Sequence, residues 1–209
     1  MLIVTSLKAD KPLDEHELKC LSDTGFKYGG NIENKNTRLS LFVRLALLNA
    51  LDKAAELDGD IADLITYPLM FEENEFGKPF FAKEHPLYNK LYFSLSHSGD
   101  LSVCALSDAA VGADVEFIRD KLPTHAKKML SDDEKITFDV LSDEEKKRFF
   151  FESWVRKESY LKCIGTGLKI YPSKLSIDEK GVVSGPYDIK LKTDLIDCEE
   201  GYICSVCRE

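Results

Sequence analysis

Apolar residues recur along much of this chain at intervals of three or four, which is the spacing of one buried face of a helix. The clearest run lies in residues 37–57, where the leucines are Leu41, Leu45, Leu48 and Leu51. Thr37 is a suitable N-cap, and Asp58-Gly59 is a suitable end for such a helix. The pattern therefore predicts a long helix over residues 37–57.

A second run with the same spacing extends from Phe149 to Ile164. Its apolar residues are Phe150, Phe151, Trp154, Val155 and Leu161. Glu158 and Lys162 lie one turn apart, on the side of the predicted helix that carries Trp154, the only tryptophan of the chain. Two interpretations of this pair remain open: a surface ion pair worth ~0.2 to 0.5 kcal/mol, or two groups of a functional site.

Polar residues mark where two helices begin in the second half of the chain. Ser131 with Glu134, and Ser142 with Glu145, match the capping box, in which a serine and a glutamate three residues later bond each other's backbone N–H groups. We expect a helix to begin after each serine. The second should continue through the run that contains Trp154 and end near Gly165, where a glycine can close a helix.

Shorter apolar runs bounded by turn residues predict β-strands. These strands are expected at residues 64–67, 91–95, 101–106, 111–117, 174–177, 187–192 and 202–206, and a short apolar run at 2–4 opens the chain. The three strands between residues 91 and 117 are separated only by turns and should form an antiparallel meander. A short helix is expected over residues 13–21, and turns or loops at 28–30, 76–79 and Gly181.

The order of these elements favours an α+β protein, because helices and strands follow one another in separate groups. With 209 residues, the chain is long enough for two lobes of roughly 100 residues each. We predict two similar α+β lobes in a pseudo-twofold arrangement, each a small, mostly antiparallel sheet packed with helices. The expected N-terminal lobe is 1–108 and the expected C-terminal lobe is 109–209.

Composition and charge narrow the function classes. A formal net charge of −9 disfavours a general nucleic-acid binder, which neutralises phosphates with Lys and Arg. No run approaches the ~18 apolar residues of a membrane span, and the first residues do not read as a secretory leader, so we expect a cytoplasmic protein. The six cysteines are expected to be reduced, and Cys204-x-x-Cys207 alone is weak support for a zinc site.

Two carboxylates share one side of a predicted strand in Asp114-Val-Glu116, because side chains alternate along extended chains. They either face solvent or bind a cation that offsets their repulsion. Carboxylate ligands without His or Cys favour Mg²⁺, with remaining positions filled by water and phosphate oxygens. Glu158 is the residue that would supply a third carboxylate.

A strand leads into a turn at residues 93–99, where hydroxyl, imidazole and amide donors come together. Ser96, His97 and Ser98 with Gly99 would suit an anionic group, although a histidine in a turn is often simply exposed. A serine hydrolase is disfavoured, because adjacent side chains point in different directions and no Gly-x-Ser-x-Gly elbow is present.

Three blocks stand in order in the middle of the chain: Ser96-His-Ser98, Gly112-Ala-Asp-Val-Glu116 and Trp154-Val-Arg-Lys-Glu-Ser-Tyr-Leu-Lys162. Gly77-Lys-Pro79 and Gly165-Thr-Gly-Leu168 add a fourth and a fifth. Together they resemble the signature blocks of the 4'-phosphopantetheinyl transferases, in the two-lobed surfactin-type group. The resemblance covers about residues 75–170. Motifs of this kind are informative in combination rather than singly.

The resemblance implies a Mg²⁺-dependent enzyme that transfers 4'-phosphopantetheine from coenzyme A to a serine hydroxyl of an apo acyl or peptidyl carrier protein and releases adenosine 3',5'-bisphosphate. By resemblance, Asp114, Glu116 and Glu158 hold the metal. Lys162 lies beside the phosphate that is transferred. Glu158 is also the expected general base, acting through a water molecule.

By the same resemblance, four residues bind the nucleotide end of coenzyme A, in a cleft between the two lobes. These residues are Lys78, Ser96, His97 and Arg38. The chain departs from the family pattern at two places: Leu130 replaces the Phe of the Phe-Ser-x-x-Glu block that ends at Glu134, and only Lys27 and Lys35 are basic in the segment before Arg38.

Other functions remain possible on the residues alone. The chain could be a non-catalytic carrier-protein or coenzyme A binding module of the same fold, a different Mg²⁺-dependent phosphohydrolase or nucleotide enzyme, or a purely structural protein. The intact carboxylates and Lys162 disfavour the first, and the absence of a P-loop disfavours the second. We expect a monomer, because two fused lobes already form the cleft, and no membrane or nucleic-acid partner.

Overall fold

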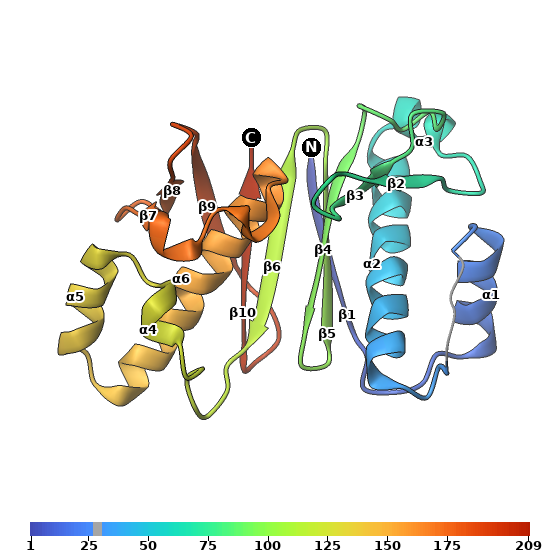
Figure 1. Ribbon diagram of the computed structural model, residues 1–209. Coiled ribbons are helices and arrows are strands. Elements are labelled where there is room, and N and C mark those ends of the chain that lie inside the picture. The colour runs from blue at the N-terminus through green and yellow to red at the C-terminus, as the bar shows by residue number, and fades with distance from the viewer. Residues whose placement is uncertain (27–30) are drawn as a thin grey trace. The chain divides into compact units, whose positions relative to one another are not determined.

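In the computed structural model, each half of the chain is built on one long helix packed against an antiparallel sheet (Figure 1). The structure describes residues 1–26 and 31–209. It divides into two compact units, Met1–Ala110 and Val111–Glu209. The boundary predicted from the sequence lies after Asp108. The loop expected at 28–30 lies outside the described residues.

The first unit contains a three-stranded antiparallel sheet in the order β1-β5-β4, with the long helix α2 against it. The strands are β1 (Leu2–Lys8), β4 (Tyr92–Ser98) and β5 (Leu101–Ser107), and the helices are α1 (Glu15–Asp23), α2 (Lys35–Leu57) and α3 (Gly59–Leu64). A small hairpin of β2 (Phe71–Glu73) and β3 (Pro79–Phe81) completes the unit. Leu41, Leu45, Leu48 and Leu51 are all buried in the core, as their spacing predicted.

Helix α2 begins earlier than predicted. Its N-cap is Asn34, whose side-chain oxygen accepts hydrogen bonds from the N–H groups of Asn36 and Thr37. The prediction of Thr37 as the cap was therefore wrong: Asn34 satisfies the first N–H groups of the helix one turn earlier. The predicted end at Asp58 is confirmed.

The strand predicted at residues 64–67 is wrong. Asp58 closes α2 and also caps a second helix, because its side-chain oxygen accepts the N–H groups of Asp60 and Ile61. Helix α3 therefore occupies residues up to Leu64. A short apolar run after a cap residue fits a helix end as well as a strand, and here the local cap decides.

The predicted three-stranded meander is wrong in its third strand. Strand β6 (Val111–Phe117) pairs with β10 (Tyr202–Arg208) in the sheet of the second unit, and not with β5. The reason lies in β5, which is the central strand of its sheet and has β1 on one edge and β4 on the other. Both hydrogen-bonding edges of β5 are thus occupied.

The second unit holds a five-stranded antiparallel sheet in the order β6-β10-β9-β8-β7, packed against α6 (Asp143–Ile164). The other strands are β7 (Ser176–Ile177), β8 (Val182–Ser184) and β9 (Lys190–Ile196). Two further helices, α4 (Ala126–Met129) and α5 (Asp132–Val140), precede α6. Two short 3-10 turns follow α6, at Gly167–Lys169 and Pro172–Lys174. The second ends at Lys174, so the strand predicted at 174–177 is reduced to β7.

The predicted helix starts in the second unit are confirmed. Ser131 with Glu134, and Ser142 with Glu145, form complete capping boxes at the starts of α5 and α6. Gly165 ends α6 in the left-handed conformation, with φ of 71°. The amphipathic run that contains Trp154 is thus the C-terminal part of a longer helix.

Gly112 lets α6 lie directly on β6. A Cβ atom at this position would come within 1.9 Å of the Ser159 carbonyl oxygen, a backbone atom that cannot move aside cheaply. The close approach brings residues of α6 next to the carboxylates of β6. Both units are α+β with antiparallel sheets, so the predicted fold class is confirmed; the pseudo-twofold arrangement stays a prediction. No helix in residues 1–26 and 31–209 is long and apolar enough to span a bilayer.

Candidate active site

Strand β6 and helix α6 bring the predicted acidic residues and Lys162 together in the second unit. Asp114 is buried on β6, and its Oδ1 accepts a hydrogen bond of 2.7 Å from the ammonium of Lys162 on α6. The pair is only partly buried, because the Lys162 side chain is 29% exposed, and it fixes the direction of that side chain. The sequence suggested a Glu158–Lys162 pair within the helix, whereas the structure directs Lys162 to the strand.

Glu158 is the carboxylate with the most unusual environment. Its Oε1 is buried and has no hydrogen-bond partner within the described part of the chain. Burial, and next the negative charge of Asp114, raise the pKa of Glu158 to about 7, although Lys162 acts in the opposite direction. A carboxyl group with this pKa can take up or release a proton near neutrality.

Glu116 points from the same side of β6 and is held by the tryptophan of α6. The indole Nε1 of Trp154 donates to Glu116 Oε1 at 3.2 Å, and an Arg119 guanidinium nitrogen lies 4.0 Å from the other carboxylate oxygen. Trp154 and Glu116 also line an apolar pocket of about 230 Å³ with Phe150, Phe151 and Met129. The tryptophan therefore orients a carboxylate as well as packing on Phe150.

The three carboxylates do not form a ready metal site in this conformation. Across residues 1–26 and 31–209, no group of three or more His, Cys, Asp or Glu side chains is arranged to hold a metal ion. Asp114 is turned toward Lys162, and Glu116 toward Trp154. The predicted Mg²⁺ site at Asp114, Glu116 and Glu158 therefore stays a prediction.

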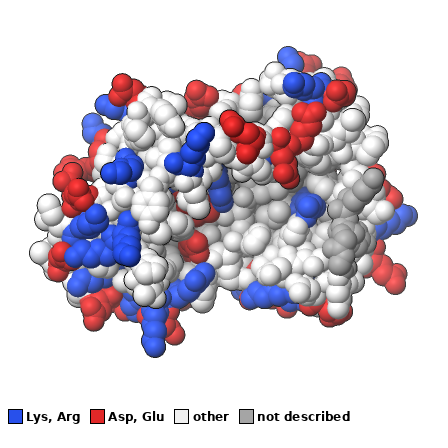
Figure 2. Space-filling model, viewed as in Figure 1, with Lys and Arg blue, Asp and Glu red and all other residues white. Residues whose placement is uncertain are grey.

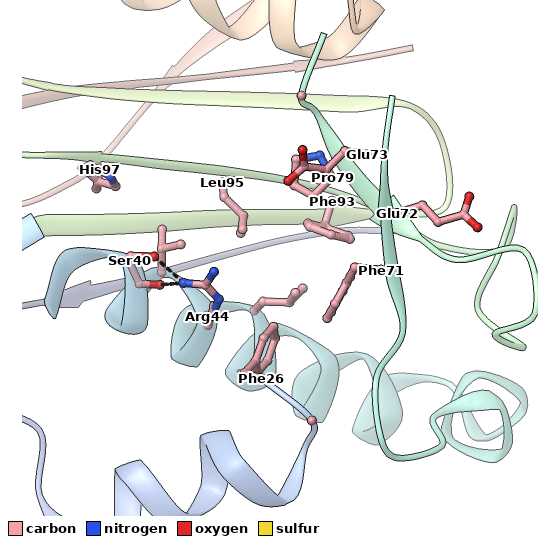
Figure 3. Close-up of a pocket in the computed structure, with 14 residues that line it drawn as sticks. Phe26, Ser40, Arg44, Phe71, Glu72, Glu73, Pro79, Phe93, Leu95 and His97 are labelled. Atoms are coloured by element: carbon pink, nitrogen blue, oxygen red, sulfur yellow. Dashed lines mark hydrogen bonds between the residues drawn. The ribbon is translucent and has the colours of Figure 1, made fainter. Parts of the chain in front are cut away.

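In the first unit, one of the predicted nucleotide-binding residues lines a pocket of about 780 Å³ (Figure 3). This residue is His97, near the end of β4; Gly77 and Pro79, the two neighbours of Lys78 in the sequence, also line the pocket. The turn that carries Lys78 is fixed by Asn74, whose side chain accepts the N–H groups of Phe76 and Lys78. This confirms the turn expected at 76–79.

Two other predicted positions do not line this pocket. Ser96 neighbours His97 on β4 and is buried on the opposite face of the strand, as alternation requires. Arg38 lies on α2 away from the pocket lining, with its Nε buried and without a hydrogen-bond partner among the described residues. Lys35, one of the two basic residues before it, pairs with Asp100 at 2.8 Å, and Lys27 lies outside the described residues.

The arginine that does line the pocket is Arg44, which the sequence reasoning missed. Its Nη1 donates to the carbonyl and hydroxyl oxygens of Ser40, and its guanidinium lies over the Phe26 ring at 5.8 Å (Figure 3). Burial lowers the pKa of Arg44. The signal in the sequence is a single cation inside the apolar run 41–48, where a charge needs a special reason.

Comparison with known proteins gives the same family as the sequence blocks. Residues 110–207 match the family model described as the 4'-phosphopantetheinyl transferase superfamily. The chain is 33% identical over 143 residues to the 4'-phosphopantetheinyl transferase gsp of Aneurinibacillus migulanus, covering 66% of this chain and 58% of the relative. It is 32% identical over 146 residues to psf-1 of Bacillus pumilus, covering 66% and 60%.

The similarity of this chain to a solved structure is weaker than its similarity in sequence to gsp and psf-1. The holo-[acyl-carrier-protein] synthase of Thermotoga maritima aligns with a TM-score of 0.37 and 18% identity, over 47% of this chain and 61% of that one. A TM-score this low carries no argument about the fold. The alignments with gsp and psf-1 span about three fifths of the length of those relatives. Residues 110–207 thus match the 4'-phosphopantetheinyl transferase superfamily, and the chain is similar to gsp and psf-1, two transferases of that name, over 66% of its own length.

Proposed function

We propose that this protein transfers the 4'-phosphopantetheine group of coenzyme A to a serine hydroxyl of an apo acyl or peptidyl carrier protein. The observation that supports this most directly is Glu158, whose pKa of about 7 suits a general base, next to the Asp114–Lys162 pair. Phosphoryl transfer asks a protein mainly for positioning and charge neutralisation. A carboxylate base beside an ammonium offers both.

In the proposed reaction, the serine oxygen forms a bond to the β-phosphorus of the coenzyme A pyrophosphate. The bond from that phosphorus to the bridging oxygen breaks, and adenosine 3',5'-bisphosphate leaves. The serine proton passes to Glu158, through a water molecule. Lys162, whose ammonium is already held at Asp114 Oδ1, would neutralise the charge that develops on the phosphate oxygens.

We propose further that Asp114, Glu116 and Glu158 hold Mg²⁺. The donors are hard carboxylate oxygens, as this ion prefers, and Glu158 has a buried oxygen atom without a hydrogen-bond partner in the described structure. The carboxylates of Asp114 and Glu158 repel each other, and a bound cation would reduce this repulsion. When bound, the ion would neutralise the pyrophosphate.

The pocket of the first unit supports a site for the nucleotide end of coenzyme A. It joins His97 and the Lys78 turn to the half-buried guanidinium of Arg44, and Phe26, Phe71 and Phe93 supply aromatic walls. A phosphate pairs well with an arginine, and an adenine ring stacks well on an aromatic ring. Arg38 and Ser96, which the resemblance also implied, remain proposed contacts outside the pocket lining.

Replacing Arg44 with methionine is expected to weaken coenzyme A binding about tenfold or more, because a charged hydrogen bond to phosphate is lost. Isothermal titration with coenzyme A, and separately with adenosine 3',5'-bisphosphate, measures this loss. The matched variant is Lys53→Met, which removes an exposed cation of the same helix outside the pocket and should leave coenzyme A affinity unchanged. Equal affinities of Arg44→Met and Lys53→Met for coenzyme A would contradict the assignment of the pocket.

Replacing Lys162 with alanine is expected to lower kcat about a hundredfold and to change coenzyme A affinity much less. The reason is that the ammonium would act on charge that develops in the transition state. Steady-state kinetics with titrated coenzyme A separate the two effects. Unchanged turnover with weakened binding would instead make Lys162 a simple ligand anchor.

We also propose that the protein acts as a monomer in the cytoplasm, on a carrier protein and without nucleic acid or membrane. The decisive experiment is incubation with coenzyme A, Mg²⁺ and a panel of apo-carriers, followed by intact-protein mass spectrometry. The expected result is a mass gain of one phosphopantetheine group on at least one carrier. No gain on any carrier, with coenzyme A binding intact, would favour the non-catalytic binding module.

A further inference from the structure

One charged side chain of α6 is buried on the side away from solvent and has no part in the proposed chemistry. Lys157 is 1% exposed, and its ammonium lies 2.5 Å from Glu134 Oε2, on a residue that is itself 9% exposed. The same ammonium donates to the carbonyl oxygen of Met129 at 3.2 Å. Lys157 therefore connects α6 with both α4 and α5.

Glu134 accepts a second hydrogen bond in the same cluster. Its Oε2 also accepts the backbone N–H of Ser131 at 2.7 Å, in the capping box that begins α5. The short segment between the end of α4 and the start of α5 is thus fixed at two backbone groups, the Met129 carbonyl and the Ser131 N–H. Both are held by one buried ion pair.

Helix α4, which leads into this segment, forms part of the wall of the apolar pocket beside Glu116. Ala126 and Met129 from α4 line the pocket together with Phe150, Phe151 and Trp154 from α6. The bond from Lys157 to the Met129 carbonyl therefore acts on the backbone of the wall itself. The pocket is bordered by Arg119 and His125, and Lys127 and Lys128 lie on α4.

A buried ion pair is an inefficient source of stability, because the cost of removing both charges from water offsets most of their attraction. The ion pair instead fixes the geometry of the groups around it, because each charged group donates or accepts hydrogen bonds in preferred directions. An apolar pair of similar size would fill the same volume without holding the Met129 carbonyl or the Ser131 N–H. The arrangement thus suits positioning better than it suits stability.

We propose that Lys157 and Glu134 are positioning residues that hold the α4 wall against α6, so that the pocket can receive apolar side chains of the carrier protein next to its serine. The carrier as occupant rests on the proposed function and on charge. The chain as a whole is acidic, yet Lys and Arg side chains gather around α4 in the second unit (Figure 2). A basic rim around an apolar pocket complements an acidic carrier.

The test is the double variant Lys157→Met/Glu134→Leu, which removes both charges together and so leaves no buried charge unpaired. Trp154, the only tryptophan, reports on the pocket without any need for activity. We expect its quenching by acrylamide to increase about twofold, as the wall loosens, while thermal unfolding stays cooperative. The matched control is Lys147→Met/Glu144→Leu, a pair in the first turns of the same helix, which should leave quenching unchanged.

The second arm measures transfer with carrier and coenzyme A titrated separately. KM for the carrier should rise about tenfold in the double variant, while KM for coenzyme A and kcat at saturating carrier stay within about twofold of wild type. Unchanged quenching in a folded variant would overturn the positioning role. Increased quenching with an unchanged carrier KM, or equal rises in both KM values, would overturn the link to the carrier.

These outcomes stay separate from the proposed function. If the wild-type protein transfers nothing to any carrier, the proposed activity fails and the carrier as occupant fails with it. The quenching comparison still decides whether Lys157 and Glu134 hold the wall.

Discussion

Replacing Asp114 with alanine is expected to lower phosphopantetheine transfer by about a thousandfold or more while the fold is retained. The side chain is buried, accepts the Lys162 ammonium at 2.7 Å and is a proposed Mg²⁺ ligand. Its loss would remove one negatively charged ligand from the proposed Mg²⁺ site and would leave the Lys162 ammonium without its partner on β6. Electrostatic groups that act on developing charge contribute effects of this size. The β6–β10 pairing depends on the backbone and should persist.

The rate is measured from the mass gain of an apo-carrier over a range of Mg²⁺ concentrations. Asp194→Ala is the matched control, because Asp194 pairs with Lys192 at 2.9 Å but both side chains are exposed on β9. An exposed pair contributes little, so this variant should keep wild-type rates. Full activity of Asp114→Ala would rule out its assignment as a metal ligand.

Replacing Glu158 with glutamine is expected to make the metal-free protein more stable at pH 8 and much less active. The pKa of Glu158 is about 7 in the folded protein, against 4.5 for an ordinary glutamate. Between these values the folded state binds more protons than the unfolded state, so this group lowers stability as pH rises from 4.5 to 7. Glutamine cannot ionise, and the variant should therefore gain on the order of 3 kcal/mol at pH 8.

Urea unfolding in the presence of a chelator, at pH 4 and at pH 8, measures this difference. At pH 4 both side chains are neutral, so the gain should vanish. Added Mg²⁺ should stabilise the wild type more than the variant at pH 8, since a ligand that binds only the folded state raises stability. Transfer by the variant should fall about a hundredfold or more, as for the loss of a general base. An equal gain at both pH values would contradict the raised pKa.

The activity and stability effects of Glu158→Gln have one physical cause. The carboxyl group lies in a poorly solvated place beside Asp114, and this costs folding free energy at neutral pH. The same environment gives the group a pKa suited to proton transfer. Stabilising the site by neutralising this residue should therefore abolish its function.

Local patterns in the sequence were sufficient for several elements. The leucine spacing of α2 and the two capping boxes at Ser131 and Ser142 predict helices that the structure confirms. The spacing of Asp114 and Glu116 places both on one side of β6. These features depend on residues within one or two turns of each other, so a short stretch of sequence contains all the information they require.

The features that were predicted wrongly or missed depend on residues that lie far apart in the sequence. The third strand of the predicted meander pairs with β10, almost ninety residues further along the chain, because β1 already occupies the second edge of β5. No local sequence pattern indicates which distant strand pairs with a given edge of β5. Arg44 was missed for the same reason: its pocket is assembled from α2, the β2–β3 hairpin and β4.

The sequence by itself determined the long helix α2, the starts of α5 and α6, the family blocks and the identity of the acidic residues and Lys162. Only the tertiary structure decided that Lys162 reaches Asp114 rather than Glu158, that Glu158 is buried with a pKa of about 7, and that Lys157 reaches Glu134 and Met129. Periodicity and capping act over a few residues, whereas burial and charge pairing depend on neighbours far away in the sequence. The chemistry of this protein therefore follows from residue types that the sequence names and from an environment that only the fold supplies.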